Sequence, residues 1–231
     1  MTKLQKFSSF INRLIPPYAR LCALAVIAAD LIAYYLPKAL DANRSLHLIS
    51  TALDDALPLV PAFILVYVLA YLQWVFAGVV ILRDSRAHCF RFVSSFILAM
   101  FLAMAVMLIW PTVMIRPAVE VRGPFTRLLA LIYRIDEPSH IFPSMHCLFS
   151  WFCFRFSLGL KRMPRWYGWA QGGFSLLVFV SVVLVKQHVW PDIFGGIAAA
   201  ELGILLSRLL GADRLIAKLD VFPEAHTVGV N

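Results

Sequence analysis

The sequence predicts an all-α membrane protein, a polytopic bundle of six transmembrane helices. Of its 231 residues, 61% are hydrophobic and only 15% are charged, whereas a typical soluble domain has about 25% charged residues. The apolar residues also gather into runs near the roughly 20 residues that a helix needs to cross the hydrocarbon core. No linker-like or repeated segment divides the sequence, so residues 1–231 are expected to form a single membrane domain.

Six apolar segments have the length and composition of spanning helices. They lie at about 18–37, 58–82, 92–115, 144–160, 166–186 and 189–210. The fourth is the shortest and contains Arg155, which we expect to pair inside the bundle with Asp30 or Glu201. Gly196 and Ala200, four residues apart, predict a close approach between the sixth span and a neighbouring helix.

Basic residues set the predicted orientation, because cytosolic loops carry an excess of Lys and Arg. With the N-terminus inside, thirteen are cytosolic, namely Lys3, Lys6, Arg13, Arg20, Arg83, Arg86, Arg91, Lys161, Arg162, Arg165, Arg208, Arg214 and Lys218. Seven lie on the other side, namely Lys38, Arg44, Arg116, Arg122, Arg127, Arg134 and Lys186. Both termini are therefore expected in the cytosol. The net charge of +8 then favours anionic membrane lipids, and the dispersed basic residues do not predict nucleic-acid binding.

The segment between the third and fourth spans, 116–143, is expected to be an extracytoplasmic loop. Within it, "PFTRLLALIYRI" at 124–135 places Arg127 and Arg134 seven residues apart on one helical face, with apolar residues elsewhere. This pattern is typical of an amphipathic helix that lies in the membrane interface.

The stretch "LVKQHVWPDIFGG", residues 184–196, places ionisable side chains between two apolar runs. Such groups persist in membranes mainly where they line a cavity or do chemistry. His188 and Asp192 are four residues apart and would share one helical face. Pro191 is tolerated only in a first turn, so the sixth helix is expected to start near His188–Trp190, where free backbone N–H groups favour an anion. The carboxylate can then fix one imidazole tautomer and stabilise its cation.

A second histidine is expected at the same outer face. In "HIFPSMHC", residues 140–147, Ser144 can cap the fourth span with its hydroxyl, which places His146 in the first helical turn. Arg116 ends the third span at this face, and its planar fork suits a phosphate group. His140 lies outside the helix start and is interpreted as structural.

Two histidines, a carboxylate and an arginine suit phosphoryl transfer through a histidine nucleophile. One imidazole attacks phosphorus while the carboxylate orients it, the other protonates the leaving oxygen, and the arginine holds the charge. A metal site made by the histidines and the aspartate is an alternative. A non-enzymatic transporter or scaffold with a polar pocket is another.

Three short motifs, in this order, resemble those of the type 2 phosphatidic acid phosphatase superfamily of membrane lipid-phosphate phosphatases. The pair Arg116–Pro117 resembles the end of the first motif. The "PSMH" of Pro143–His146 resembles the Pro-Ser-Gly-His motif. Ser181, His188 and Asp192 match the third, which has the spacing S(x6)HxxxD.

This resemblance implies an integral membrane enzyme that hydrolyses a lipid phosphate or pyrophosphate at the extracytoplasmic face, with no metal or other cofactor. His188 would be the nucleophile that forms a phosphohistidine, Asp192 its orienting partner, and His146 the general acid. The residues that bind the phosphate would be Arg116, Ser144 and Ser181.

The sequence also departs from the family pattern. Ile109 and Val182 stand where the family has a lysine and an arginine, and Met145 replaces a glycine. Lys186, two residues before the expected nucleophile, is the candidate replacement cation. "KQHxxxD" with a reduced first motif also resembles the sphingolipid-synthase-like phosphotransferases, in which an alcohol resolves the phosphoenzyme. A lipid head-group phosphotransferase is therefore an alternative, and the sequence does not give the lipid, the acceptor or the oligomeric state.

Overall fold

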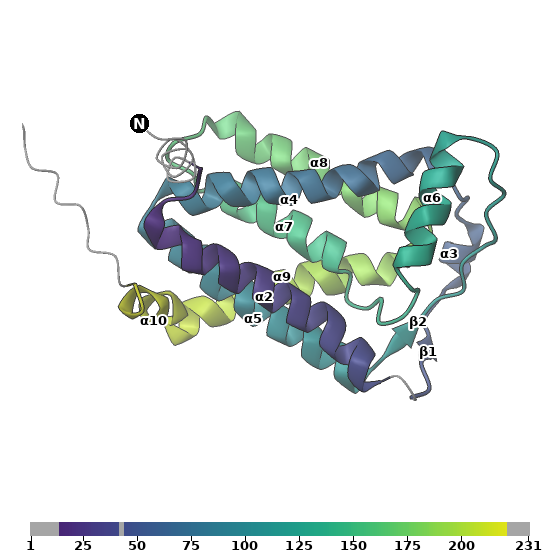
Figure 1. Ribbon diagram of the computed structural model, residues 1–231, viewed down its shortest axis with the longest axis horizontal. Coiled ribbons are helices and arrows are strands. Elements are labelled where there is room, and N and C mark those ends of the chain that lie inside the picture. Colours follow the sequence, from purple (N-terminus) through teal and green to yellow (C-terminus); the bar gives the residue numbers. More distant parts are fainter. Residues whose placement is uncertain (1–13, 42–43, 221–231) are drawn as a thin grey trace, which may run out of the picture.

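A computed structural model describes residues 14–41 and 44–220. It is mostly helical, with long helices side by side along the longest axis of the molecule and small elements gathered at one end (Figure 1). Three basic residues that count toward the predicted orientation lie outside the described residues, namely Lys3, Lys6 and Arg13.

Five helical segments are long and apolar enough to cross a membrane. They are α2 (Pro17–Leu40), η1 (Pro61–Phe63) with α4 (Ile64–Asp84), α5 (Arg86–Ile109), α8 (Arg165–Leu184) and α9 (Trp190–Leu210). They match five of the six expected segments. The remaining one, 144–160, corresponds to α7 (Met145–Ser157), which has 13 residues and is about 20 Å long at 1.5 Å per residue. Five helices rather than six therefore meet the length of a spanning helix within the described residues.

Helix α7 nevertheless lies inside the bundle, where it packs against α4, α8 and α9 (Figure 1). Leu148 and Phe152 on its apolar face are fully buried. The Oγ atom of Ser144 accepts the backbone N–H of Cys147 at 3.3 Å, which satisfies one of the free donors of the first turn. The predicted helix start at Ser144, with His146 in the first turn, is confirmed.

The predicted bounds of the third span, 92–115, were wrong by six residues at each end. Helix α5 begins directly after Ser85, which caps it, and ends at Ile109. Pro111 cannot donate a backbone hydrogen bond, and the residues around it run extended. Their apolar side chains explain why hydropathy alone misplaced the helix end.

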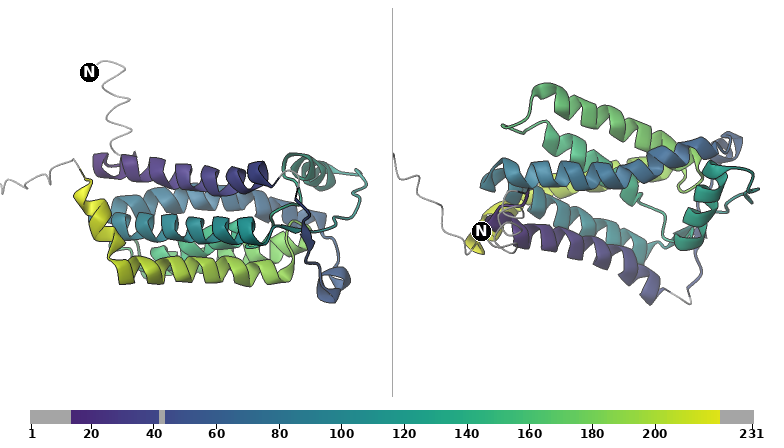
Figure 2. Two further views of the ribbon diagram at one scale, coloured as in Figure 1. Left: turned by 90° about the horizontal axis from the view of Figure 1, so that it is seen from below. Right: turned by 45° about the horizontal axis from the view of Figure 1, so that its top comes forward.

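The short elements gather at the end of the bundle that also holds the loop between α8 and α9 (Figures 1 and 2). They are β1 (His47–Leu48), α3 (Ala52–Ala56), β2 (Thr112–Val113) and α6 (Pro124–Ile135). The parallel β1–β2 pair and α3 were not predicted. Helix α6 confirms the helix that was expected at 124–135, whereas α10 (Ala212–Lys218) lies at the opposite end.

Two of the three ionisable residues expected to pair inside the bundle do so. Arg155 on α7 forms an ion pair with Glu201 on α9, and the indole N–H of Trp151 donates to the same carboxylate at 2.7 Å. Asp30 on α2 takes no part in this pair. It lines a cavity at the end of the bundle that carries α3 and α6.

Gly196 allows α9 to touch the start of α7. A Cβ atom on Gly196 would lie 2.5 Å from the backbone oxygen of Ser144 and 3.0 Å from the Cβ atom of Cys147. In this contact the backbone N–H of Ser144 donates to the backbone oxygen of Asp192 at 3.2 Å. The close approach predicted from the small residues is therefore confirmed, and it joins the two segments that carry the predicted site.

Gly196→Ala is expected to lower the free energy of unfolding by about 1–3 kcal/mol, because the added methyl group has no room against Ser144. Gly173→Ala is the matched control, since nothing lies within 4 Å of a Cβ atom built on Gly173. Thermal unfolding of both variants in detergent measures the difference. Equal melting temperatures would show that the α7–α9 contact does not need the glycine.

Candidate active site

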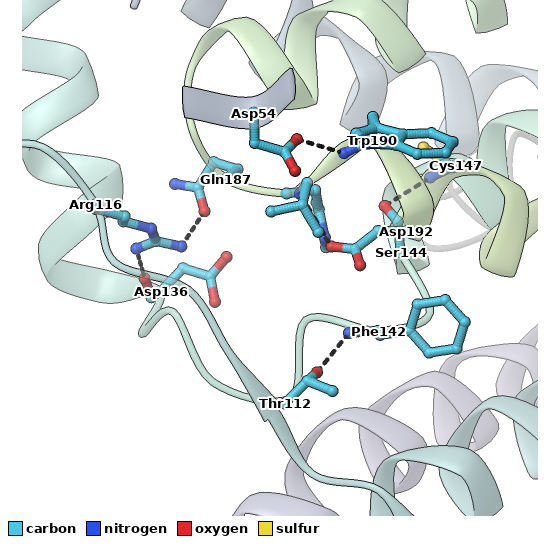
Figure 3. A network of polar contacts seen from close by, with 12 residues as sticks. Asp54, Thr112, Arg116, Asp136, Phe142, Ser144, Cys147, Gln187, Trp190 and Asp192 are labelled. Atoms are coloured by element: carbon cyan, nitrogen blue, oxygen red, sulfur yellow. Dashed lines mark hydrogen bonds and ion pairs between the residues drawn. The ribbon is translucent and has the colours of Figure 1, made fainter. Parts of the chain in front are cut away.

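A cavity of about 280 Å³ lies at the end of the bundle that carries α3 and α6. Its walls come from α2, α4 and α7, from the segment after α6, and from the turn between α8 and α9. Three of the predicted site residues line it, namely Arg116, His146 and His188. Figure 3 shows polar contacts around this region, with side chains from the loops and helix starts pointing toward one another.

His188 and Asp192 form a pair at the start of α9. The Nδ1 atom of His188 lies 2.9 Å from Oδ2 of Asp192. The same oxygen accepts the backbone N–H of Val189 at 3.2 Å, so the carboxylate is fixed as part of the helix cap. The Asp192 side chain is fully buried, whereas that of His188 is 11% exposed. The expected pairing of these residues is confirmed, although His188 precedes the helix rather than lying on it.

This arrangement selects one tautomer of His188. An ionised carboxylate only accepts hydrogen bonds, so Nδ1 carries the hydrogen and Nε2 presents its lone pair. Among the described residues, Nε2 has no hydrogen-bond partner. The free nitrogen of His188 is therefore available to a ligand in the cavity.

His146 lies opposite His188, with 5.9 Å between the ring centroids. Its ring stacks on Tyr67, at 4.2 Å between centroids, and meets the edges of Tyr71 and Trp74. The Nε2 atom of His146 is buried and has no hydrogen-bond partner among the described residues. The aromatic rings fix the plane of the imidazole at the cavity wall.

Arg116 is held beside the histidine pair. Its guanidinium donates to the backbone oxygen of Asp136 and to Oε1 of Gln187, the residue before His188 (Figure 3). The Cζ atom lies 4.8 Å from the ring centroid of Tyr133 on α6, a cation–π contact. These contacts place a fixed positive charge next to the expected nucleophile.

A second cation, which the sequence interpretation missed, lines the cavity. The Nζ atom of Lys38, at the end of α2, lies 3.5 Å from Oδ1 of Asp136 and donates to the Tyr34 hydroxyl at 2.8 Å. The Tyr34 hydroxyl donates to Asp136 at 2.6 Å. Burial opposes ionisation of Asp136, but the hydrogen bond from Tyr34 and the charge of Lys38 hold the pKa of this carboxyl below its usual value. The carboxylate is thus an anion held by Lys38 and the Tyr34 hydroxyl in the cavity wall.

Two predicted phosphate ligands are absent from the lining of the cavity. Ser144 is fully buried and caps α7 with its hydroxyl. Ser181 is also fully buried, and its hydroxyl donates to the backbone oxygen of Val178 at 2.8 Å. His140 does line the wall, but its Nε2 lies 3.2 Å from Oδ2 of Asp41, in agreement with its structural interpretation.

Lys186 is also directed away from the cavity. Its φ of 53° is the left-handed conformation that commonly ends a helix. Its Nζ atom donates to the backbone oxygens of Asp54, at 2.5 Å, and Leu57, at 2.7 Å. The structure therefore does not bring Lys186 to Arg116 and the histidines, as its role as a replacement cation would require.

Helix α3 supports the turn that carries His188. The Oδ1 atom of Asp54 accepts the backbone N–H of Trp190 at 2.8 Å (Figure 3), and the indole N–H of Trp190 donates to the Thr51 hydroxyl at 2.9 Å. With Lys186 bound to the carbonyl groups at the end of α3, these contacts fix both sides of the turn.

A metal site was an alternative interpretation of the same residues. In the part of the chain that the structure describes, no group of three His, Cys, Asp or Glu side chains is arranged to hold a metal ion. The arrangement instead places His146, His188, Arg116 and Lys38 around one cavity.

Comparison of the chain with protein-family models, with curated proteins and with solved structures gave no match. The resemblance of the three motifs to the phosphatase superfamily therefore stays a prediction.

Lys186→Met is expected to destabilise the protein by about 1–3 kcal/mol, because two carbonyl groups lose their donor while the apolar stem is kept. Lys186→Arg should restore part of the stability. Thermal unfolding measures both variants, and binding of vanadate, a phosphate mimic, should be unchanged wherever the fold is intact. Normal stability with loss of vanadate binding would contradict this expectation and would indicate that Lys186 binds the phosphate group.

Proposed function

We propose that this protein is an integral membrane lipid phosphatase that hydrolyses a lipid phosphate or pyrophosphate through a phosphohistidine intermediate. The observation that supports it most is the pair of histidine rings, 5.9 Å apart, of which one is held by a buried carboxylate. Arg116 and Lys38 line the same cavity, where they can hold a phosphate group.

In the proposed reaction, the Nε2 lone pair of His188 attacks phosphorus and the bond from phosphorus to the lipid oxygen breaks. His146, in its protonated form, gives its proton to the leaving oxygen. Asp192 stabilises the positive charge on the phosphorylated imidazole through Nδ1–H. His146 then accepts a proton from water, which attacks phosphorus, releases inorganic phosphate and restores His188.

The charge on the transferring phosphoryl group spreads over three oxygens and needs positioned cations. Arg116 offers a planar fork that can donate two parallel hydrogen bonds. Lys38 is paired with Asp136, so an incoming phosphate would compete with that carboxylate for Lys38 and for the Tyr34 hydroxyl. Lys38 thus replaces Lys186 as the proposed second cation.

We further propose six membrane crossings, with both termini in the cytosol and the histidine pair at the extracytoplasmic face. The thirteen-to-seven asymmetry of basic residues supports this orientation. Helix α7 would be the short crossing. Its Arg155 is neutralised by Glu201, and its start is buried against α9, so lipid need not cover its full length.

The direct test incubates purified protein with a panel of lipid phosphates and pyrophosphates, with and without EDTA. Release of inorganic phosphate that EDTA leaves unchanged, and that His188→Ala abolishes, is the expected result. A new phosphodiester lipid without free phosphate would identify a phosphotransferase. EDTA-sensitive turnover would indicate a metal site, and a folded protein without turnover on any lipid would favour a transporter or scaffold.

His146→Ala should lower turnover of a lipid monophosphate by about 100-fold or more, because an alkoxide leaving group needs the proton. The aryl oxide of an activated aryl phosphate leaves without that proton. The loss of kcat on this substrate should therefore be at least about tenfold smaller than the loss on the lipid. The comparison of kcat on the two substrates tests the role of general acid. Equal losses on both substrates would contradict it.

Lys38→Met should lower kcat/KM at least about tenfold, which corresponds to roughly 1.4 kcal/mol of transition-state stabilisation. Arg127→Met is the matched control, because Arg127 is exposed on α6 and is not among the residues that line the cavity. Thermal unfolding separates loss of charge from loss of fold. A folded Lys38→Met variant with wild-type turnover would exclude Lys38 from phosphate binding.

The orientation can be tested with single cysteines at Ser45, Glu120 and Met163. The four native cysteines are buried, so background labelling should be low. In intact cells, an impermeant thiol reagent is expected to label positions 45 and 120 but not 163. Labelling of 163 alone would reverse the proposed orientation.

A further inference from the structure

A second cavity, of about 660 Å³, lies at the opposite end of the bundle from the histidine pair. Residues of α5, α7, α9 and α10 line it. Four of these residues are arginines that come from all four helices, namely Arg91, Arg155, Arg208 and Arg214. The proposed phosphatase reaction makes no use of this cavity.

The turn after α9 gives the cavity one of its walls. Gly211 has a φ of 61°, the left-handed conformation that ends a helix and suits glycine. Helix α10 then turns across the end of the bundle and packs on α5 (Figure 2). An ion pair between Arg86 and Asp220 joins the start of α5 to the residues after α10. Arg214 on α10 is thereby brought to the same cavity as Arg91.

The arginines of this cavity exceed the carboxylates near them. Arg155 is paired with Glu201, and Asp213 also lines the cavity. Four arginines are therefore accompanied by two carboxylates. Arg208 and Arg214 form no salt bridge within the described residues. The Nε atom of Arg91 donates to the backbone oxygen of Ala87, and its two terminal nitrogens form no hydrogen bond with any other described residue.

Apolar side chains stand beside these charges. Leu209 and Leu210 also line the cavity, and they are 71% and 65% exposed. Both lie in the last turn of a helix that is long and apolar enough to span a membrane, and the ends of such helices are where lipid head groups meet acyl chains. A ligand of this cavity therefore meets guanidinium groups at one side and apolar surface at the other.

We propose that this cavity binds the phosphate head group of an anionic phospholipid from the leaflet at this end of the bundle. Guanidinium groups suit the phosphate oxygens, because their planar forks donate paired hydrogen bonds. The leucines would contact the upper part of the acyl chains. A free phosphate ion offers the same anionic chemistry, but it would leave the exposed leucines and most of the cavity unused.

A bound head group would bridge α10 to α5 and α9, so its binding should stabilise the folded protein. The test titrates purified protein in a neutral detergent, at about 0.15 M salt, where exposed charges are screened beyond roughly 8 Å. Short-chain phosphatidylglycerol is the probe, phosphatidylcholine is the zwitterionic control, and inorganic phosphate represents the free anion. Calorimetry gives the affinity and thermal unfolding gives the stabilisation.

The variant for this test is the double substitution Arg208→Gln with Arg214→Gln. Its matched control is Arg83→Gln with Arg165→Gln, since both of these arginines are exposed at the same end but do not line the cavity. Both variants lose two charges. Each retains the histidine cavity, so any phosphatidylglycerol that binds there contributes equally to the two measurements.

We expect the cavity variant to lose at least about tenfold in affinity for phosphatidylglycerol and to lose its thermal stabilisation, while the control changes less than about threefold. Equal losses in both variants would overturn the proposal, because they would show a diffuse basic surface. Inorganic phosphate that binds as tightly as the lipid, and whose affinity falls in the cavity variant but not in the control, would also overturn it, since the ligand of this cavity would then be a free anion. Melting temperatures without lipid show whether the cavity variant folds. If it does not fold, Arg208→Lys with Arg214→Lys replaces it, and unchanged affinity in that variant would contradict the need for planar forks.

Discussion

The proposed site depends on one contact, in which the first turn of α7 meets the first turn of α9. The backbone N–H of Ser144 donates to the backbone oxygen of Asp192, and Gly196 leaves room for this approach. Ser144 starts the helix that carries His146, and the Asp192 side chain holds His188. This backbone hydrogen bond therefore joins the start of α7, which positions His146, to the start of α9, which positions His188.

Around this contact, three charged side chains of the proposed site have partners, as an apolar bundle requires. Asp192 is bound to His188 and to a backbone N–H, Arg116 lies against Tyr133, and Lys38 is paired with Asp136. These partners hold the groups in place before any substrate arrives. Nε2 of both histidines has no hydrogen-bond partner among the described residues, and the same holds for Nε of Arg116 and Nε2 of Gln187 in the same cavity wall. An arrangement fixed in advance in this way is what electrostatic stabilisation of a transition state needs.

The parts of the site that were predictable from the sequence are local. The spacing of His188 and Asp192, and the cap that precedes His146, follow from rules about a single helical turn. Lys38 and Asp136 come from distant segments, and no spacing in the sequence joins them to the histidines. The direction of the Lys186 side chain was not predictable, because nearness in sequence gives no direction, and its left-handed backbone sends the side chain to α3. The third span was misplaced for a related reason, since apolar residues after Ile109 form a strand rather than more helix.

The central claim is that His188 forms a covalent bond to phosphorus, and trapping that intermediate tests it most directly. The protein would be mixed with a lipid phosphate carrying radiolabelled phosphorus, denatured in alkali within the first turnovers, digested and mapped. A phosphohistidine survives alkali and is lost in acid, so the account predicts an alkali-stable, acid-labile label on the peptide that contains His188. The label should be absent from His188→Ala. Turnover without any label on that peptide, or a label that persists in the variant, would contradict the account.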